Sequence, residues 1–83
     1  MTVMQQYFSR PRYGIRATVG ASIYLSVRKT QDGVIAEPER LLGGNEAQRH
    51  AWIAAVEFVR TGQPEAAVKA LEKANFYVEP FFV

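Results

Sequence analysis

The sequence predicts a small α+β fold, in which an antiparallel sheet of three to four strands is covered on one face by an αα-hairpin. Three observations predict it. Residues 15–28 alternate strictly between two kinds of side chain, residues 45–74 carry two apolar stripes with helical spacing, and glycines and prolines separate these segments. A chain of 83 residues has room for one hydrophobic core. We therefore expect one domain spanning residues 1–83.

The alternating segment predicts a β-hairpin. Every odd position from Ile15 to Val27 is apolar, and every even position is polar or glycine. A single strand of this length would span about 45 Å, which is too long for so small a domain. A three-residue loop preserves the parity of the alternation, whereas a two-residue loop reverses it. We expect a loop of residues 18–20 that ends in Gly20 and pairs Ala17 with Ala21; a strand kinked at Gly20 is the alternative.

Two further strands are expected beside the hairpin. Asp32-Gly33 is a turn signal and should return the chain into a short strand over residues 34–37, ended by Pro38. Residues 1–12 are expected to form an edge strand, over residues 3–8, or an irregular arm. Pro11 has no N–H to give to a ladder and therefore separates this arm from the hairpin that starts at residue 13.

Residues 45–75 predict two amphipathic helices packed against each other. Asn45 is a good N-cap, and Trp52, Val56 and Val59 lie on one helix face. Gly62 should end this first helix, and Pro64 suits the first turn of the second. The second helix carries its own stripe, formed by Ala67, Val68, Leu71 and Ala74. The short connection predicts an antiparallel αα-hairpin whose apolar faces cover the odd-numbered residues of the sheet.

Residues 76–83 form an apolar tail. Phe76 and Val78 are expected to close the core, with this segment serving as a last strand. Phe81 and Phe82 either tuck into the fold or contact a partner, because a fully exposed apolar tail would favour aggregation.

The composition argues against an enzyme or a membrane protein. There are no cysteines, which excludes disulfides, thiol nucleophiles and thiolate zinc sites, and no apolar run approaches a membrane span. The N-terminus does not resemble a secretory signal, so we expect a cytoplasmic protein. His50, with Glu46 and Glu57 on a similar helix face, is too sparse a set for a metal site. We expect no catalytic residues, metal, cofactor or small-molecule substrate.

The polar side of the hairpin is the candidate binding surface. The net charge up to Ala36 is +4 and that from Glu37 onward is −2, so the strand region is the basic part of the chain. Our first hypothesis is an adaptor, inhibitor or accessory factor that binds another protein, or a second copy, through this face and the tail. The alternative is a nucleic-acid-binding module, because tyrosines can stack on bases while arginines hold phosphates. Cross-strand packing of Tyr13 on Tyr24 would need no ligand. The candidate residues are Arg10, Arg12, Tyr13, Arg16, Tyr24, Arg28, Phe81 and Phe82.

Overall fold

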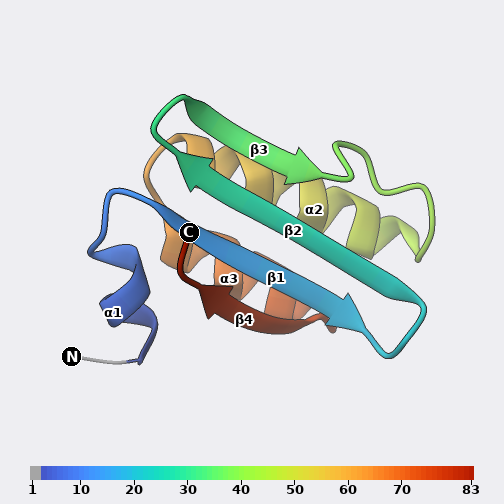
Figure 1. The fold of residues 1–83 in the computed structure, drawn as a ribbon. Helices are drawn as coiled ribbons and strands as arrows, with labels where there is room; N and C mark the ends of the chain where they lie inside the picture. Colours follow the sequence, from blue (N-terminus) through green and yellow to red (C-terminus); the bar gives the residue numbers. More distant parts are fainter. Residues whose placement is uncertain (1–2) are drawn as a thin grey trace.

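A four-stranded antiparallel sheet with two helices packed on one face forms the body of the molecule (Figure 1). The computed structural model describes residues 3–83, and the sheet order is β3-β2-β1-β4. The predicted α+β class is therefore confirmed. In chain order the elements are α1 (Val3–Phe8), β1 (Tyr13–Val19), β2 (Ile23–Thr30), β3 (Gly33–Glu37), α2 (Glu46–Arg60), α3 (Pro64–Lys73) and β4 (Tyr77–Phe81).

The predicted β-hairpin is present, but its register differs from the expectation. Ala17 pairs with Leu25 and Val19 with Ile23, so the loop is residues 20–22 rather than 18–20. Gly20, with φ +54, begins this loop instead of ending it, and the Ser22 N–H donates to the Val19 carbonyl oxygen at 3.2 Å. Ala21 is exposed at the turn, between the paired residues Val19 and Ile23. A shift of two residues leaves the parity unchanged, which is why the alternation alone could not distinguish the two loops.

The third strand is confirmed, but its even-numbered residues, not its odd-numbered ones, lie on the helix-covered side. Thr30 pairs with Gly33, so the loop between β2 and β3 is Gln31 and Asp32, one position before the Asp32-Gly33 pair that was expected. This two-residue loop pairs odd with even positions. The half-buried Val34 and Ala36 therefore continue the helix-covered side of β2, while Ile35 lies on the opposite side.

The two helices begin and end at the residues that the sequence predicts. The Asn45 side chain accepts a hydrogen bond from the Gln48 N–H at 2.8 Å, and the Gln48 side chain accepts one from the Asn45 N–H at 3.1 Å. This capping box satisfies two of the free donors at the start of α2. Gly62, with φ +76, follows the C-terminal end of α2, and Pro64 is the first residue of α3.

The fourth strand comes from the tail and not from the N-terminal arm. β4 pairs antiparallel with β1, placing Val78 opposite Ala17. The expected edge strand over residues 3–8 is wrong: Val3–Phe8 is the helix α1, while residues 1 and 2 of the predicted arm lie outside the described residues. Met4 and Phe8, one helical turn apart, both pack against the core. Short apolar segments fit either secondary structure, and here packing selects the helix.

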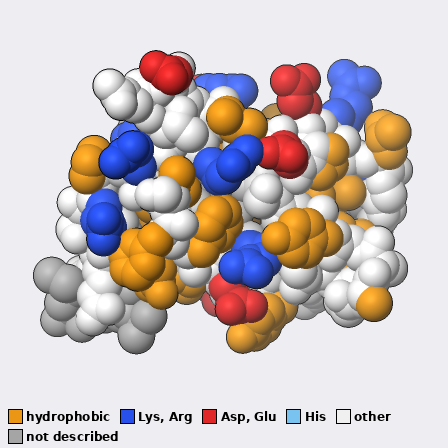
Figure 2. Space-filling view, viewed as in Figure 1, with side chains coloured by type: hydrophobic (Ala, Val, Ile, Leu, Met, Phe, Trp, Pro, Cys, Tyr) orange, Lys and Arg blue, Asp and Glu red, His pale blue; other side chains and the backbone are white. Residues whose placement is uncertain are grey.

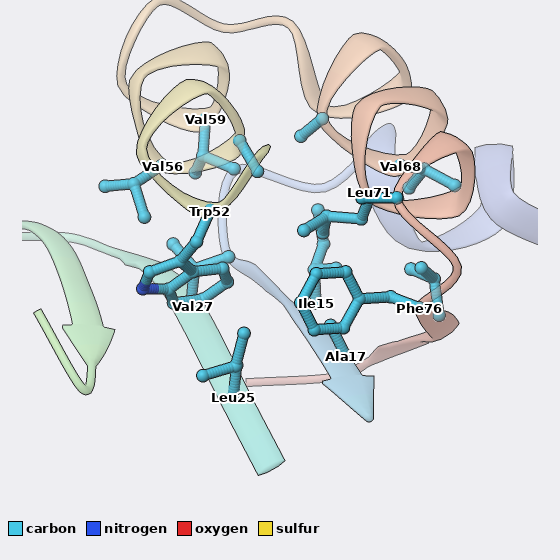
Figure 3. Packing of buried hydrophobic residues seen from close by; sticks show 14 of the residues in the cluster. Ile15, Ala17, Leu25, Val27, Trp52, Val56, Val59, Val68, Leu71 and Phe76 are labelled. Carbon is cyan, nitrogen blue, oxygen red and sulfur yellow. The ribbon is translucent and has the colours of Figure 1, made fainter. Parts of the chain in front are cut away.

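The core lies between the helix pair and the sheet (Figure 3). Trp52 is fully buried, and its indole Nε1 donates to the Pro38 carbonyl oxygen at 2.8 Å. Phe76 and Val78 are also buried, as predicted for the start of the tail. The side chains that meet across the two layers include Ile15, Ala17, Leu25 and Val27 from the sheet and Trp52, Val56, Val59, Val68 and Leu71 from the helices.

Candidate interaction surface

The side of the sheet that faces away from α2 and α3 is the candidate surface, and we call it the open face. No described helix covers it in Figure 1, and Figure 2 shows charged side chains of both signs interspersed with hydrophobic ones on this side. Its residues follow from the strand registers: Gly14, Arg16 and Thr18 of β1, Tyr24, Ser26, Arg28 and Thr30 of β2, Gly33, Ile35 and Glu37 of β3, and Tyr77, Glu79 and Phe81 of β4.

Two exposed tyrosines flank β1 at one end of the open face, Tyr24 on β2 and Tyr77 on β4. Thr18 pairs with Tyr24 on one side and with Tyr77 on the other. Tyr24 is 62% exposed and Tyr77 is 67% exposed. Ring faces this accessible, held on paired strands, offer apolar contact area at a small cost in conformational entropy. Tyr77 was not among the predicted site residues because its strand was not assigned a register on the sheet.

The charges of the open face balance. One row across the sheet, read through the registers, is Glu37, Ser26, Arg16 and Glu79. Arg28, in the next row, donates to Glu37 at 2.5 Å. Both partners are partly exposed, so this ion pair mainly orients the two side chains and adds little stability. The arginines that suggested a basic surface are thus offset by two glutamates that come from β3 and β4.

Arg16 and Phe81 form a packed pair at the centre of the open face. The guanidinium carbon of Arg16 lies 5.3 Å from the centroid of the Phe81 ring. Phe81 itself lies across Gly14: a Cβ built on that glycine would come within 2.1 Å of the ring. The Nε of Arg16 is buried and has no hydrogen-bond partner among residues 3–83. Phe81 therefore lies on the open face, where it is half-buried against Gly14 and Arg16 of its own chain.

Tyr13 does not lie on the open face. Its side chain is 2% exposed in the core, and its ring meets Phe8 edge to face at 5.0 Å. Tyr13 pairs with Lys29, so the proposed cross-strand contact with Tyr24 is also wrong. Burial raises the pKa of the Tyr13 phenol above its usual value of 10.0 and keeps it neutral. Its odd number already gave it the parity of Ile15 and Ala17, and this was the signal that the candidate set overlooked.

Arg10 and Phe82 form a separate cluster beside α1. The Phe82 ring stacks on Tyr7 at a centroid distance of 4.3 Å, and the Arg10 guanidinium lies 4.8 Å from the same ring. Phe82 remains 54% exposed. Arg12 is exposed in the segment between α1 and β1. The eight predicted residues thus divide between the open face (Arg16, Tyr24, Arg28 and Phe81), the core (Tyr13) and the α1 side of the molecule (Arg10, Arg12 and Phe82).

Among the described residues, the surface of α2 brings together no comparable set of polar groups. His50 Nε2 lies 3.9 Å from Glu46 Oε1 with both side chains exposed, and Glu57 pairs with Arg60 instead. Within residues 3–83 no three histidine, aspartate or glutamate side chains are grouped closely enough to hold a metal ion.

Across the described part of the chain, none of the helices has both the length and the apolar character needed to cross a bilayer.

Comparison with known proteins leaves the fold and the open face as the basis for a function. No family of proteins, no curated protein and no solved structure matches the chain.

Proposed function

We propose that this protein is a non-enzymatic interaction module that binds a protein partner with the open face of its sheet. The observation that carries the proposal is the pair of rings Tyr24 and Tyr77, which are 62% and 67% exposed, together with arginines and glutamates in equal number on one sheet face that no described helix covers. Tyrosine and arginine are the residues that protein interfaces favour, and mixed charges fix the orientation of a partner. In this proposal the protein acts in the cytoplasm as an adaptor, inhibitor or accessory factor.

The contribution of the tail to binding is narrower than the sequence suggests. Phe81 supports the proposal because it lies on the open face beside Arg16. The Phe82 ring already packs within its own chain: its centroid lies 4.3 Å from that of Tyr7 and 4.8 Å from the Arg10 guanidinium. We therefore assign partner contact to Phe81 and a docking role for α1 to Phe82.

The test compares an open-face variant with a matched control. The double substitution Tyr24→Ser with Tyr77→Ser removes both exposed rings, whereas Leu42→Ser removes an even more exposed apolar side chain (82%) from the loop before α2. Each immobilised protein is exposed to nuclease-treated lysate, and the captured protein is identified and then titrated. Loss of two exposed aromatic contacts should weaken binding at least about tenfold. Equal affinity of the double variant and wild type would refute the proposal.

Nucleic-acid binding is the second candidate, and one observation favours it. Tyr24 and Tyr77 flank Thr18 as two exposed rings, with Arg16 in the adjacent row, an arrangement on which single-stranded bases could stack. Against it, Glu37 and Glu79 cancel the positive charge that phosphate binding requires. Titration with labelled oligonucleotides at two salt concentrations separates the candidates: binding that weakens steeply with salt and is lost in Arg16→Gln would favour nucleic acid.

A further inference from the structure

The two edges of the sheet differ in how well they are protected against the addition of another strand. At the β4 edge, Pro80 lies within the strand and has no N–H to offer an incoming strand. The helix α1 contacts β4, and Tyr7 stacks on Phe82 directly after it. Proline and a covering helix are the devices by which proteins prevent another strand from adding to a sheet edge.

The β3 edge has neither device. Its sequence, Gly-Val-Ile-Ala-Glu, contains no proline and no lysine, and in Figure 1 no described segment lies in the sheet beyond it. Alternate residues of an edge strand direct their N–H and C=O groups away from the sheet, so β3 presents backbone groups that no strand among residues 3–83 pairs with. Ile35, at the middle of the strand, is 44% exposed.

A second exposed isoleucine, Ile53 of α2, lies near the same edge of the sheet, in the helix layer. Ile53 follows Trp52, which points at the sheet, and is therefore turned about 100° around the α2 axis from it. Ala51, Ala55 and Phe58 occupy the other flank of α2, where they are buried or half-buried and α3 packs. Ile53, which is 63% exposed, thus lies on the flank away from α3, above the β3 edge.

We propose that two copies of this chain associate by pairing their β3 strands antiparallel about a two-fold axis at Ile35, which makes a continuous eight-stranded sheet. In this register Ile35 faces Ile35 of the second copy on the open face. Val34 faces Ala36 of the second copy on the helix-covered side, where both are already half-buried. Gly33 and Glu37 face each other at the two ends, so the bulkier glutamate lies opposite a residue without a side chain.

The charges at this edge allow the pairing of identical strands. The two Glu37 residues would lie four strand positions apart, about 14 Å, which exceeds the screening length of about 8 Å at physiological salt. Each also has its own Arg28 at 2.5 Å. On the same flank of α2 as Ile53, Arg49 donates to the Gly44 carbonyl oxygen at 2.7 Å and Arg60 pairs with Glu57 at 3.5 Å. Arg28, Arg49 and Arg60 are therefore each engaged within their own chain.

The positions of the helices suit the same arrangement. α2 contacts both β2 and β3, so it lies over this pair of strands. The axes of the two α2 helices would then be separated by two strand spacings, about 10 Å, which is close to the usual distance between packed helices. In the proposed dimer, the exposed Ile53 side chains lie between the two α2 helices, and the Ile35 side chains lie between the two β3 strands on the open face.

The test is the mass of the purified protein in solution, measured by sedimentation equilibrium over a range of concentrations. Wild type should approach twice the chain mass of 9.3 kDa. Ile35→Glu places two carboxylates directly opposite each other in the dimer, while within its own chain the new carboxylate is paired in register with Arg28. We expect it to weaken self-association at least about a hundredfold, because facing like charges are strongly unfavourable, with an unchanged circular dichroism spectrum.

Mixing Ile35→Glu with Ile35→Lys should restore the dimer, since opposite charges then face each other. Tyr77→Glu, the matched control on the far strand β4, should remain dimeric. A wild type that stays monomeric at all concentrations, or an Ile35→Glu protein that still dimerises, would overturn the inference. The mass is measured without any partner present, so a monomeric result would contradict the dimer without contradicting partner binding. Conversely, loss of partner capture in the Tyr24→Ser, Tyr77→Ser variant would contradict the proposed function without contradicting the dimer.

Discussion

Gly14 shows how one residue's identity depends on a side chain from the other end of the chain. Phe81 crosses it so closely that an added Cβ would approach the ring to 2.1 Å, and the ring in turn lies beneath Arg16. The glycine is not required by its φ, which is not in the left-handed region. It is required by the space that the Phe81 ring occupies.

At this scale we predict that Gly14→Ala destabilises the fold by about 1 kcal/mol, because overpacking displaces Phe81 and separates it from Arg16. In a Phe81→Ala background the effect should change sign, because without the ring alanine is favoured over glycine in a strand by about 0.5–1 kcal/mol. Urea denaturation of the four proteins in this double-mutant cycle measures the difference. An equal loss in both backgrounds would show that Phe81 is not the cause.

Among the elements, α2 depends on a local signal at its start. Asn45 and Gln48 cap it reciprocally, and Gln48 Nε2 also donates to the Ala74 carbonyl oxygen at 3.3 Å, which joins the beginning of α2 to the end of α3. We expect Asn45→Ala to lower the free energy of unfolding by about 1 kcal/mol, whereas Asn45→Ser should be nearly neutral because serine can accept the same hydrogen bond. Thermal denaturation checks both; an equal loss in the two variants would mean that the side-chain cap is not what stabilises the helix.

On the scale of the whole molecule, Trp52 joins the helix layer to the sheet and to the segment after β3. It is fully buried, and its indole donates to the Pro38 carbonyl oxygen. Trp52→Ala should cost about 3–5 kcal/mol, a large part of the stability of so small a domain. Trp52→Phe keeps most of the packing and should cost less, and guanidinium denaturation followed by far-ultraviolet circular dichroism measures both. A loss below about 1 kcal/mol for the alanine variant would contradict the central position of this side chain.

The candidate surface could be predicted only in part. The even-numbered residues Arg16, Tyr24 and Arg28 were placed on the open face because parity alone determines which side of a strand a residue occupies. Tyr77, Glu79 and Glu37 could not be placed there, because their strands join the sheet through registers that local patterns do not specify. For that reason the surface was expected to be basic, whereas in the folded protein the glutamates of β3 and β4 balance its arginines.

The sequence by itself determined which face of the hairpin strands is covered by the helices and where both long helices begin and end. These features depend on periodicity and capping within a few neighbouring residues. The sequence did not determine the burial of Ala21, which was expected to face inward and is exposed at the turn. Only the tertiary structure decided the loop at residues 20–22, the helical form of α1 and the neighbours of each strand. A register shift of two residues and a short apolar segment are both compatible with the same local pattern, so long-range packing has to choose between the alternatives.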